Sequence, residues 1–177
     1  VVVIGSGAGG GTLSNELAQK GIDVVCLEAG SRLTLVDIEN DPGLMNERIG
    51  WNDPRLGPGV WLCKTVGGTT VRWHAITPRI QEHEFRPRST YGLLEDTTLI
   101  DWPLTLEELA PYYDQAEDRM GVTGTHGVPP SFETSNYKVL RAGGRRLGYT
   151  EITSTRSAIN PVARDGRPGC LQIGFCS

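Results

Sequence analysis

The chain has 177 residues, of which 38% are hydrophobic and 21% are charged, a composition typical of a folded globular protein. Its formal net charge is −4, which argues against a partner with a phosphate backbone, such as a nucleic acid. No apolar run reaches the roughly 18 residues that a membrane helix requires, and its four cysteines are too few for a disulfide scaffold.

Both ends of the sequence look like cut ends. Val1 already lies inside an apolar run, and Ser177 follows Cys176 directly, with no closing element. We therefore expect a fragment of a longer chain, whose first residue carries no information about the compartment of the whole protein.

The first residues have the pattern of a strand, a glycine turn, a helix and a second strand. The β-branched run 1–4 is typical of a parallel strand buried on both faces. Residues 12–20 have apolar side chains at helical spacing, and Gly21 stands where helices often end. Residues 22–27 form a second β-branched run. The pattern predicts one βαβ unit.

The glycines between the first strand and the helix have the spacing of a dinucleotide-binding turn. Gly5 permits a tight turn, Gly7 lets backbone N–H groups approach a pyrophosphate, and Gly10 lets the helix pack close to the strand. Glu28, at the end of the second strand, can accept hydrogen bonds from ribose hydroxyls and disfavours a 2′-phosphate. An ordinary glycine turn beside a solvated Glu28 is the alternative. The predicted cofactor contacts here are Gly5, Gly7, Ala8, Gly9, Gly10, Glu28 and Ala29.

A second glycine-rich segment follows a long stretch without periodicity. Residues 31–62 are rich in Asp, Asn, Pro and Gly, which predicts an irregular excursion. The segment 65–74 then offers small residues and two hydroxyls, so its backbone could lie against a cofactor and donate N–H bonds. Turn chemistry alone also explains these residues. The predicted contacts are Gly67, Gly68, Thr69 and Thr70.

Helices are predicted in the second half of the chain. Thr105 and Glu108 have capping-box spacing at the start of a helix over 105–120, and Pro111 predicts a separate or kinked first turn. A weaker helix is expected over 137–147. The Thr, Ile and Ser residues of 150–160 favour strands.

Two segments carry a resemblance to a known family. Residues 66–80 read VGGTTVRWHAITPRI, and residues 101–124 read DWPLTLEELAPYYDQAEDRMGVTG. Together with LEAG at 27–30, they resemble the glucose–methanol–choline (GMC) oxidoreductases. The resemblance is strongest to the branch of pyranose oxidases, bacterial FAD-dependent sugar dehydrogenases and gluconate dehydrogenase flavoproteins.

This resemblance implies a fold and an activity. The fold would be α/β, with an incomplete Rossmann-like FAD-binding domain (a parallel sheet with flanking helices) leading into part of an α+β substrate domain. Residues 1–80 would hold the FAD-binding unit and 81–177 the partial substrate-domain region. The activity would be oxidation of a CH–OH group of a sugar or polyol, with hydride transfer to flavin N5.

The family pattern also bears on the residues after the second glycine pair. A histidine that carries a covalent flavin link in pyranose oxidases falls on Arg72, which cannot form that bond, so non-covalent FAD is predicted. Trp73 and His74 follow where the family approaches the flavin, so Arg72, Trp73 and His74 join the predicted cofactor contacts. For His74, an ordinary satisfied surface or core histidine is the alternative.

No catalytic residue or metal ligand is assigned. The family's catalytic histidine lies near its C-terminus, and none of the histidines here (His74, His83 and His126) stands in that motif. We therefore expect the fragment alone to lack turnover.

Cys170 and Cys176 have three interpretations: unbridged structural cysteines, a disulfide, or part of the iron–sulfur site found in some relatives. Two cysteines are too few for a cluster, so the ligand count argues against the third.

Two other functions remain as alternatives to the sugar or polyol oxidoreductase. One is a truncated or degenerate cofactor-binding module without catalysis. The other is an NAD(P)H-coupled flavoprotein that shares only the first βαβ unit, against which the second glycine segment argues.

Overall fold

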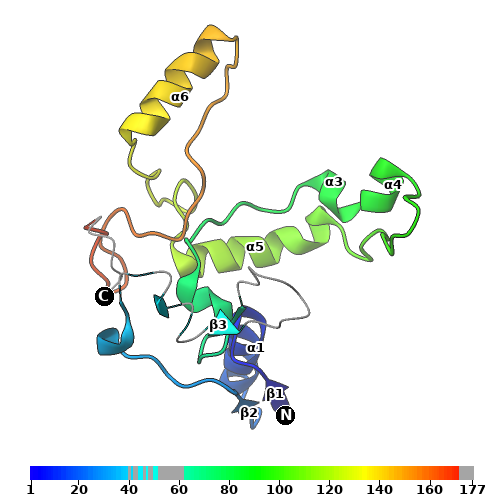
Figure 1. Ribbon diagram of the computed structural model, residues 1–177, viewed down its shortest axis with the longest axis vertical. Helices are drawn as coiled ribbons and strands as arrows, with labels where there is room; N and C mark the ends of the chain where they lie inside the picture. The colour runs from blue at the N-terminus through cyan, green and yellow to red at the C-terminus, as the bar shows by residue number, and fades with distance from the viewer. Residues whose placement is uncertain (40, 42–43, 46, 48–49, 52–61, 172–177) are drawn as a thin grey trace. The chain divides into compact units, whose positions relative to one another are not determined.

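The computed structural model describes residues 1–39, 41, 44–45, 47, 50–51 and 62–171 (Figure 1). The described chain divides into two units, Val1–His74 and Ala75–Leu171, each of which we describe by itself. Within these described residues, no helix combines the length and the apolar character needed to cross a membrane.

The first unit begins with the predicted βαβ arrangement. Strand β1 (Val2–Ile4) pairs in parallel with strand β2 (Val25–Leu27), and helix α1 (Ala8–Gln19) connects them. Helix α1 begins earlier than the predicted residue 12. The turn after β1 is complete at Gly7, the N-cap of α1, so the glycines after Ala8 already belong to the helix.

The two faces of β1 differ in burial. Val3 is buried against α1, where the Cβ position of Gly10 would lie 3.2 Å from Val3 Cγ1. Val2 and Ile4 point to the other face and are 63% and 87% exposed. The expectation of a strand buried on both faces is therefore wrong for the described chain, because α1 covers only one face.

The excursion predicted for 31–62 lies partly outside the described residues. Its described residues hold short elements: 3₁₀-helix η1 (Leu35–Asp37), strand β3 (Gly50–Trp51) and strand β4 (Leu62–Cys63). Strands β3 and β4 pair antiparallel. The second glycine segment then forms the 3₁₀-helix η2 (Gly68–Arg72).

The second unit is helical, with helices α3 (Glu82–Phe85), α4 (Pro87–Tyr91), α5 (Leu106–Met120) and α6 (Ser135–Arg146). The capping box of α5 is confirmed: Glu108 N donates to Thr105 Oγ1 at 3.1 Å, and Thr105 N donates to Glu108 Oε2 at 2.8 Å. Gly121 ends the helix with φ of 68°. The predicted separate first turn is wrong, because one continuous helix contains Pro111. The capping box already fixes the first turn, and proline withholds a single N–H.

Helix α6 confirms the weaker of the two predicted helices and explains one of its glycines. Thr134 caps it by accepting from Tyr137 N at 3.2 Å, so α6 begins two residues before the predicted start. A Cβ on Gly144 would lie 2.5 Å from Ile152 Cδ1, and Tyr137 Oη donates to Ile152 O at 3.0 Å. The chain after α6 therefore returns onto the helix at Ile152.

The strands favoured for 150–160 are not found in that described segment. Its one β-type pairing is an isolated bridge between Ile76 and Ser157. Hydroxyl contacts hold the segment instead: Thr123 and Ser157 are buried and their oxygens lie 3.2 Å apart, while Ser131 Oγ is 2.9 Å from Ser157 Oγ. The β-type composition was therefore misleading, and of these residues Ser157 bonds through its hydroxyl to Thr123 and Ser131 outside the segment.

A buried carboxylate joins separate parts of the second unit. Glu117 of α5 is 3% exposed. It accepts from Arg79 at both oxygens, at 2.7 and 2.6 Å, and from Arg156 Nη1 at 2.9 Å. This arrangement holds the pKa of Glu117 at about 2, chiefly through the hydrogen bond from Arg79. The ion pair therefore links α5 to segments about 40 residues away on either side.

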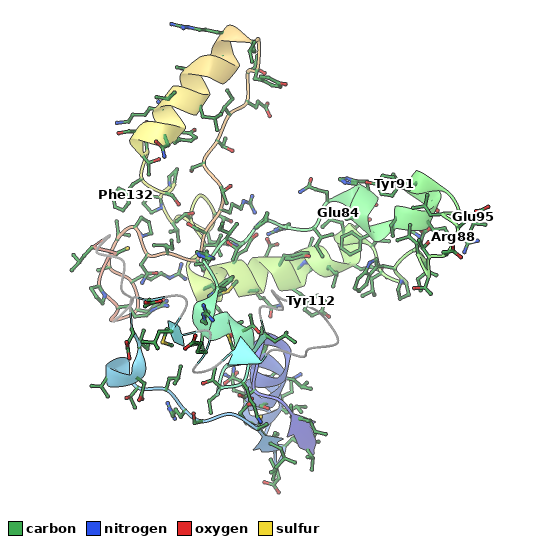
Figure 2. The ribbon with its side chains drawn as sticks, viewed as in Figure 1. Glu84, Arg88, Tyr91, Glu95, Tyr112 and Phe132 are labelled. Atoms are coloured by element: carbon green, nitrogen blue, oxygen red, sulfur yellow. The ribbon has the colours of Figure 1, made fainter. Side chains whose placement is uncertain are left out.

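Large aromatic side chains remain on the surface of the second unit. Figure 2 shows three of them, Tyr91, Tyr112 and Phe132, which are 59%, 67% and 53% exposed. Apolar contact within the chain therefore contributes little at these three positions.

We predict that Glu117→Gln destabilises the protein by about 3 kcal/mol, because two guanidinium groups lose a buried anionic partner. The matched control is Asp114→Asn. Asp114 also accepts from Arg79 Nη2 at 2.6 Å but is 55% exposed, so its loss should cost less than about 1 kcal/mol. Urea unfolding of the intact protein measures both. Equal losses for the two variants would contradict the prediction.

Candidate functional site

The first glycine turn lies between the end of β1 and the start of α1. Gly5 has φ of 88°, and its N–H donates to Leu27 O at 2.7 Å, which ties the turn to the end of β2. Gly7 is the N-cap of α1 and offers no side chain to the helix. The first N–H groups of any α-helix lack partners inside it, so these donors face whatever approaches the turn.

The glycines of this turn fall into two kinds. A Cβ on Gly10 would lie 1.9 Å from Gly5 O, so contacts within the protein require glycine there. A Cβ on Gly7 or Gly9 would meet nothing within 4 Å. Gly7 also has φ of −63°, which any residue can adopt. The fold therefore does not explain Gly7, whereas a ligand lying against the backbone would.

Glu28 follows β2 and turns its carboxylate toward the glycine turn. Oε2 accepts from Ser6 N at 2.9 Å and from Ser6 Oγ at 2.7 Å, and Oε1 accepts from Gly30 N at 2.8 Å. These bonds, the one from Ser6 N first, lower the pKa of Glu28 to about 2. The half-buried carboxylate is thus a fixed negative charge at the strand end.

The second glycine segment lies directly against the first. Gly67 N donates to Ser6 Oγ at 2.9 Å, although 61 residues separate them. A Cβ on Gly68 would lie 3.0 Å from Gly7 Cα. Gly67 and Gly68 have φ of 94° and 58°, the left-handed region that favours glycine. The structure therefore brings together the two glycine segments that the sequence singled out separately.

A buried threonine anchors this second segment. Thr65 is fully buried, and its Oγ1 donates to Ser31 O at 2.7 Å. A Cβ on Gly30 would lie 2.2 Å from the Lys64 carbonyl carbon, so glycine is required where the chain after Glu28 passes the second segment.

The remaining predicted contacts have varied surroundings. Thr69 Oγ1 accepts from Cys63 N of β4 at 3.3 Å, and Thr70 Oγ1 donates to Gly67 O, so both hydroxyls already have partners within the protein. Arg72 ends η2 and is half-buried, whereas Ala29, Trp73 and His74 are exposed. Cofactor contact by these residues stays a prediction.

Sequence reasoning missed Ser6, Gly30 and Thr65. The only local signal for Ser6 was a hydroxyl between two glycines that were already assigned to the site. Gly30 and Thr65 carry no local signal, because their importance comes from a contact between segments more than thirty residues apart.

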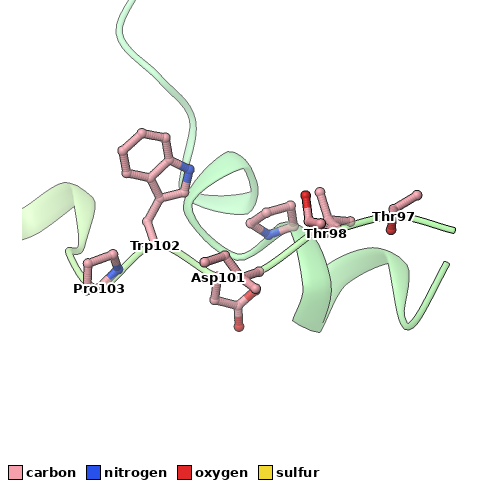
Figure 3. A pocket seen from close by; sticks show the side chains of 8 residues that line it. Thr97, Thr98, Asp101, Trp102 and Pro103 are labelled. Atoms are coloured by element: carbon pink, nitrogen blue, oxygen red, sulfur yellow. The ribbon is translucent and has the colours of Figure 1, made fainter. Parts of the chain in front are cut away.

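Two other features of the described chain resemble ligand sites. Asp114, Glu117 and His126 place possible ligand atoms within 4.8 Å of one another, but Arg79 Nη2 already lies 2.6 Å from both carboxylates and supplies the cation. A hollow of about 500 Å³, shown in Figure 3, is lined by Pro87 and residues 97–103. Its Asp101 carboxylate accepts from Ser89 N at 3.0 Å, and so caps α4.

One member of the cysteine pair, Cys170, belongs to the described residues. Cys170 is exposed, and its N–H donates to Asn160 O at 2.8 Å. Cys176 lies outside the described residues. The three interpretations of the pair therefore stay predictions.

Comparison with known proteins finds relatives across nearly the whole chain. The chain is 35% identical to paromamine 6′-oxidase of Streptomyces fradiae over 99% of its own length and 34% of that protein. It is 30% identical to the fructose dehydrogenase large subunit of Gluconobacter japonicus, over 99% of the chain and 39% of that protein. It is 31% identical to a GMC-type oxidoreductase of Mycobacterium tuberculosis, over 98% of the chain and 26% of that protein. No family model matches the chain. The chain thus spans about a third of the length of the curated relatives it matches.

We predict that Gly10→Ala destabilises the protein by about 1–3 kcal/mol, because the new methyl group would overlap Gly5 O. Gly7→Ala is the matched control. Its Cβ would enter open space at an ordinary φ, so its effect should stay below about 1 kcal/mol. Unfolding of the cofactor-free protein measures both, and a Gly7→Ala loss as large as that of Gly10→Ala would refute the distinction.

The lowered pKa of Glu28 predicts how stability depends on pH. Because the folded pKa is about 2 and the ordinary value 4.5, the contribution of Glu28 is complete above about pH 4.5 and is lost as pH falls toward 2. Glu28→Gln should therefore lose less stability than the wild type over this interval. Urea unfolding at a series of pH values measures the difference, and identical slopes would contradict the prediction.

Proposed function

Because the chain belongs to the glucose–methanol–choline oxidoreductase family, we propose that it is the FAD-binding part of an enzyme that oxidises a CH–OH group of a sugar or polyol. The observation that carries the proposal is the contact between the two glycine segments at the N-terminus of α1. Bound FAD would supply the redox chemistry by accepting a hydride at N5. The residues of this chain would bind and orient it.

The N-terminus of α1 would hold the pyrophosphate. Gly7 leaves the backbone open, and the unpaired N–H groups and the helix dipole favour a negative group there. A bound pyrophosphate would explain why position 7 is a glycine, since neither its backbone conformation nor a contact within the protein requires one.

Glu28 would hold the ribose of the adenosine. Its Oε1 accepts from Gly30 N at 2.8 Å, and a ribose hydroxyl would approach the same carboxylate as a further donor. Its low pKa keeps the group ionised at any physiological pH, and a fixed anion here disfavours a cofactor with a 2′-phosphate.

The second segment would lie along the rest of the cofactor. Its turn at Gly67 and Gly68 has no side chain to separate a ligand from the backbone, and it is already in contact with the first turn. This arrangement argues against a flavoprotein that shares only the first βαβ unit.

With Arg72 where covalent relatives have histidine, FAD would be held without a covalent bond. Trp73 and His74 would approach it from the end of η2.

The substrate class rests on the relatives. One is named for oxidation of paromamine and another for dehydrogenation of fructose, which supports a hydroxyl group of a sugar or polyol as the site of oxidation. We assign no catalytic residue among these 177 residues. The base that removes the hydroxyl proton is proposed to lie in the portion of the relatives that this chain does not span.

We predict that the intact protein is yellow when purified, releases FAD into the supernatant on acid precipitation, and loses its flavin colour when fructose or another polyol is added without oxygen. Gly7→Ala should fold normally and bind FAD at least about tenfold more weakly, because the added methyl group enters the proposed pyrophosphate site. Colour that stays with the precipitate would refute the non-covalent attachment. If no hydroxyl compound reduces the bound FAD, the non-catalytic cofactor-binding module is favoured. If NAD(P)H alone reduces it, the NAD(P)H-coupled flavoprotein is favoured.

A further inference from the structure

We propose that Ser6 is a positioning residue, whose hydroxyl sets the Glu28 carboxylate and the Gly67 turn in the one arrangement that receives the cofactor. The proposal rests on the proposed function and deepens it. It assigns a role to a side chain that stands between the glycines of the turn and that neither motif requires.

The hydroxyl of Ser6 has two partners. It donates to Glu28 Oε2 at 2.7 Å and accepts from Gly67 N at 2.9 Å. A serine hydroxyl has one donor and two acceptor positions, so both bonds form at once. The Ser6 oxygen therefore joins Glu28, the proposed partner of the ribose, to Gly67 of the second glycine segment.

The two bonds from Ser6 hold the Glu28 carboxylate in one orientation. Ser6 N and Ser6 Oγ both donate to Oε2, while Oε1 accepts from Gly30 N at 2.8 Å. Bonds to a charged acceptor are stronger than neutral ones, so the carboxylate is held in this rotamer. Without the hydroxyl, Oε2 would keep only the backbone donor, and the side chain would be freer to turn.

A second bond of the same hydroxyl holds the second turn. Gly67 N is part-buried and finds its acceptor in Ser6, while Gly68 lies against Gly7. With alanine at position 6, the Gly67 N–H would lose this acceptor, and an unpaired, partly buried donor favours a shift of the turn. A shift here would change the backbone that is proposed to lie along the cofactor.

Other hydrogen bonds that do not involve this hydroxyl also hold the first unit together. Thr65 Oγ1 and Val66 N both donate to Ser31 O, at 2.7 and 3.1 Å, and Gly5 N donates to Leu27 O. Loss of the Ser6 hydroxyl should therefore leave the unit folded and act mainly on the geometry of the site.

The test compares Ser6→Ala with Ser14→Ala in the intact protein. Ser14 Oγ, on α1, is buried and has no hydrogen-bond partner among the residues described, so it controls for removal of a hydroxyl from the same region. Titration of the apoprotein with FAD should show Ser6→Ala binding at least about tenfold more weakly and Ser14→Ala binding like the wild type. Ser6→Thr, which retains a hydroxyl, should recover most of the affinity.

A second measurement separates positioning from general weakening. The effect of Ser6→Ala on FAD affinity should be much smaller in a Glu28→Gln background, since part of the effect passes through that carboxylate. The pKa of Glu28, followed by the NMR shift of its carboxyl carbon in the apoprotein, should rise by about one pH unit in Ser6→Ala.

The outcomes distinguish this proposal from the proposed function. A wild type that binds no FAD overturns the proposed function, and with it the positioning role toward the cofactor. A wild type that binds FAD while Ser6→Ala matches Ser14→Ala overturns the role of Ser6 alone. Additive effects of Ser6→Ala and Glu28→Gln, an unchanged Glu28 pKa, or an unfolded Ser6→Ala protein would each also overturn it.

Discussion

Glu28 accepts a backbone and a hydroxyl hydrogen bond from Ser6, and the candidate site depends on this contact more than on any other. It brings the end of β2 against the turn after β1, although the two are 22 residues apart in sequence. It also leaves the Ser6 oxygen able to accept from Gly67, so the second glycine segment is placed by the same group. Without the carboxylate, the Ser6 hydroxyl would lose its acceptor, and the hydrogen bond that it accepts from Gly67 N would be held less firmly.

The close approach of the two turns also requires particular glycines, for different physical reasons. At Gly10 a side chain would overlap the turn itself, and at Gly30 it would overlap the backbone at Lys64. At Gly67 the constraint is conformational, since φ of 94° disfavours other residues. Gly7 meets neither condition in the described structure. A glycine without an internal reason, at the end of a helix with open N–H groups, is what a bound phosphate would explain.

The sequence predicted the features that depend on neighbouring residues. The strand, turn and helix of the first unit and the capping box at Thr105 and Glu108 follow from patterns a few residues long, and the structure confirms them. The predicted separate first turn before Pro111 is not formed, because one missing N–H was outweighed by a well-capped helix. The strands predicted over 150–160 are not found either, and Ser157 of this segment bonds through its hydroxyl to Thr123. The contact between Ser6 and Gly67 could not be predicted, because its partners are 61 residues apart and neither is unusual in its own surroundings.

Two carboxylates of this chain have a pKa of about 2, and the cause of each value shows why a low pKa alone does not mark a functional site. Glu117 is ionised because guanidinium groups surround it, and those cations occupy both of its oxygens. It has no capacity left for a ligand, so its charge is used to join segments of the second unit. Glu28 is ionised because uncharged N–H and O–H groups point at it. Its negative charge is therefore not neutralised by a neighbouring cation in these bonds. A carboxylate stabilised by neutral donors can still bind a hydroxyl ligand, whereas one neutralised by arginine cannot, and this difference separates the candidate site from the structural ion pair.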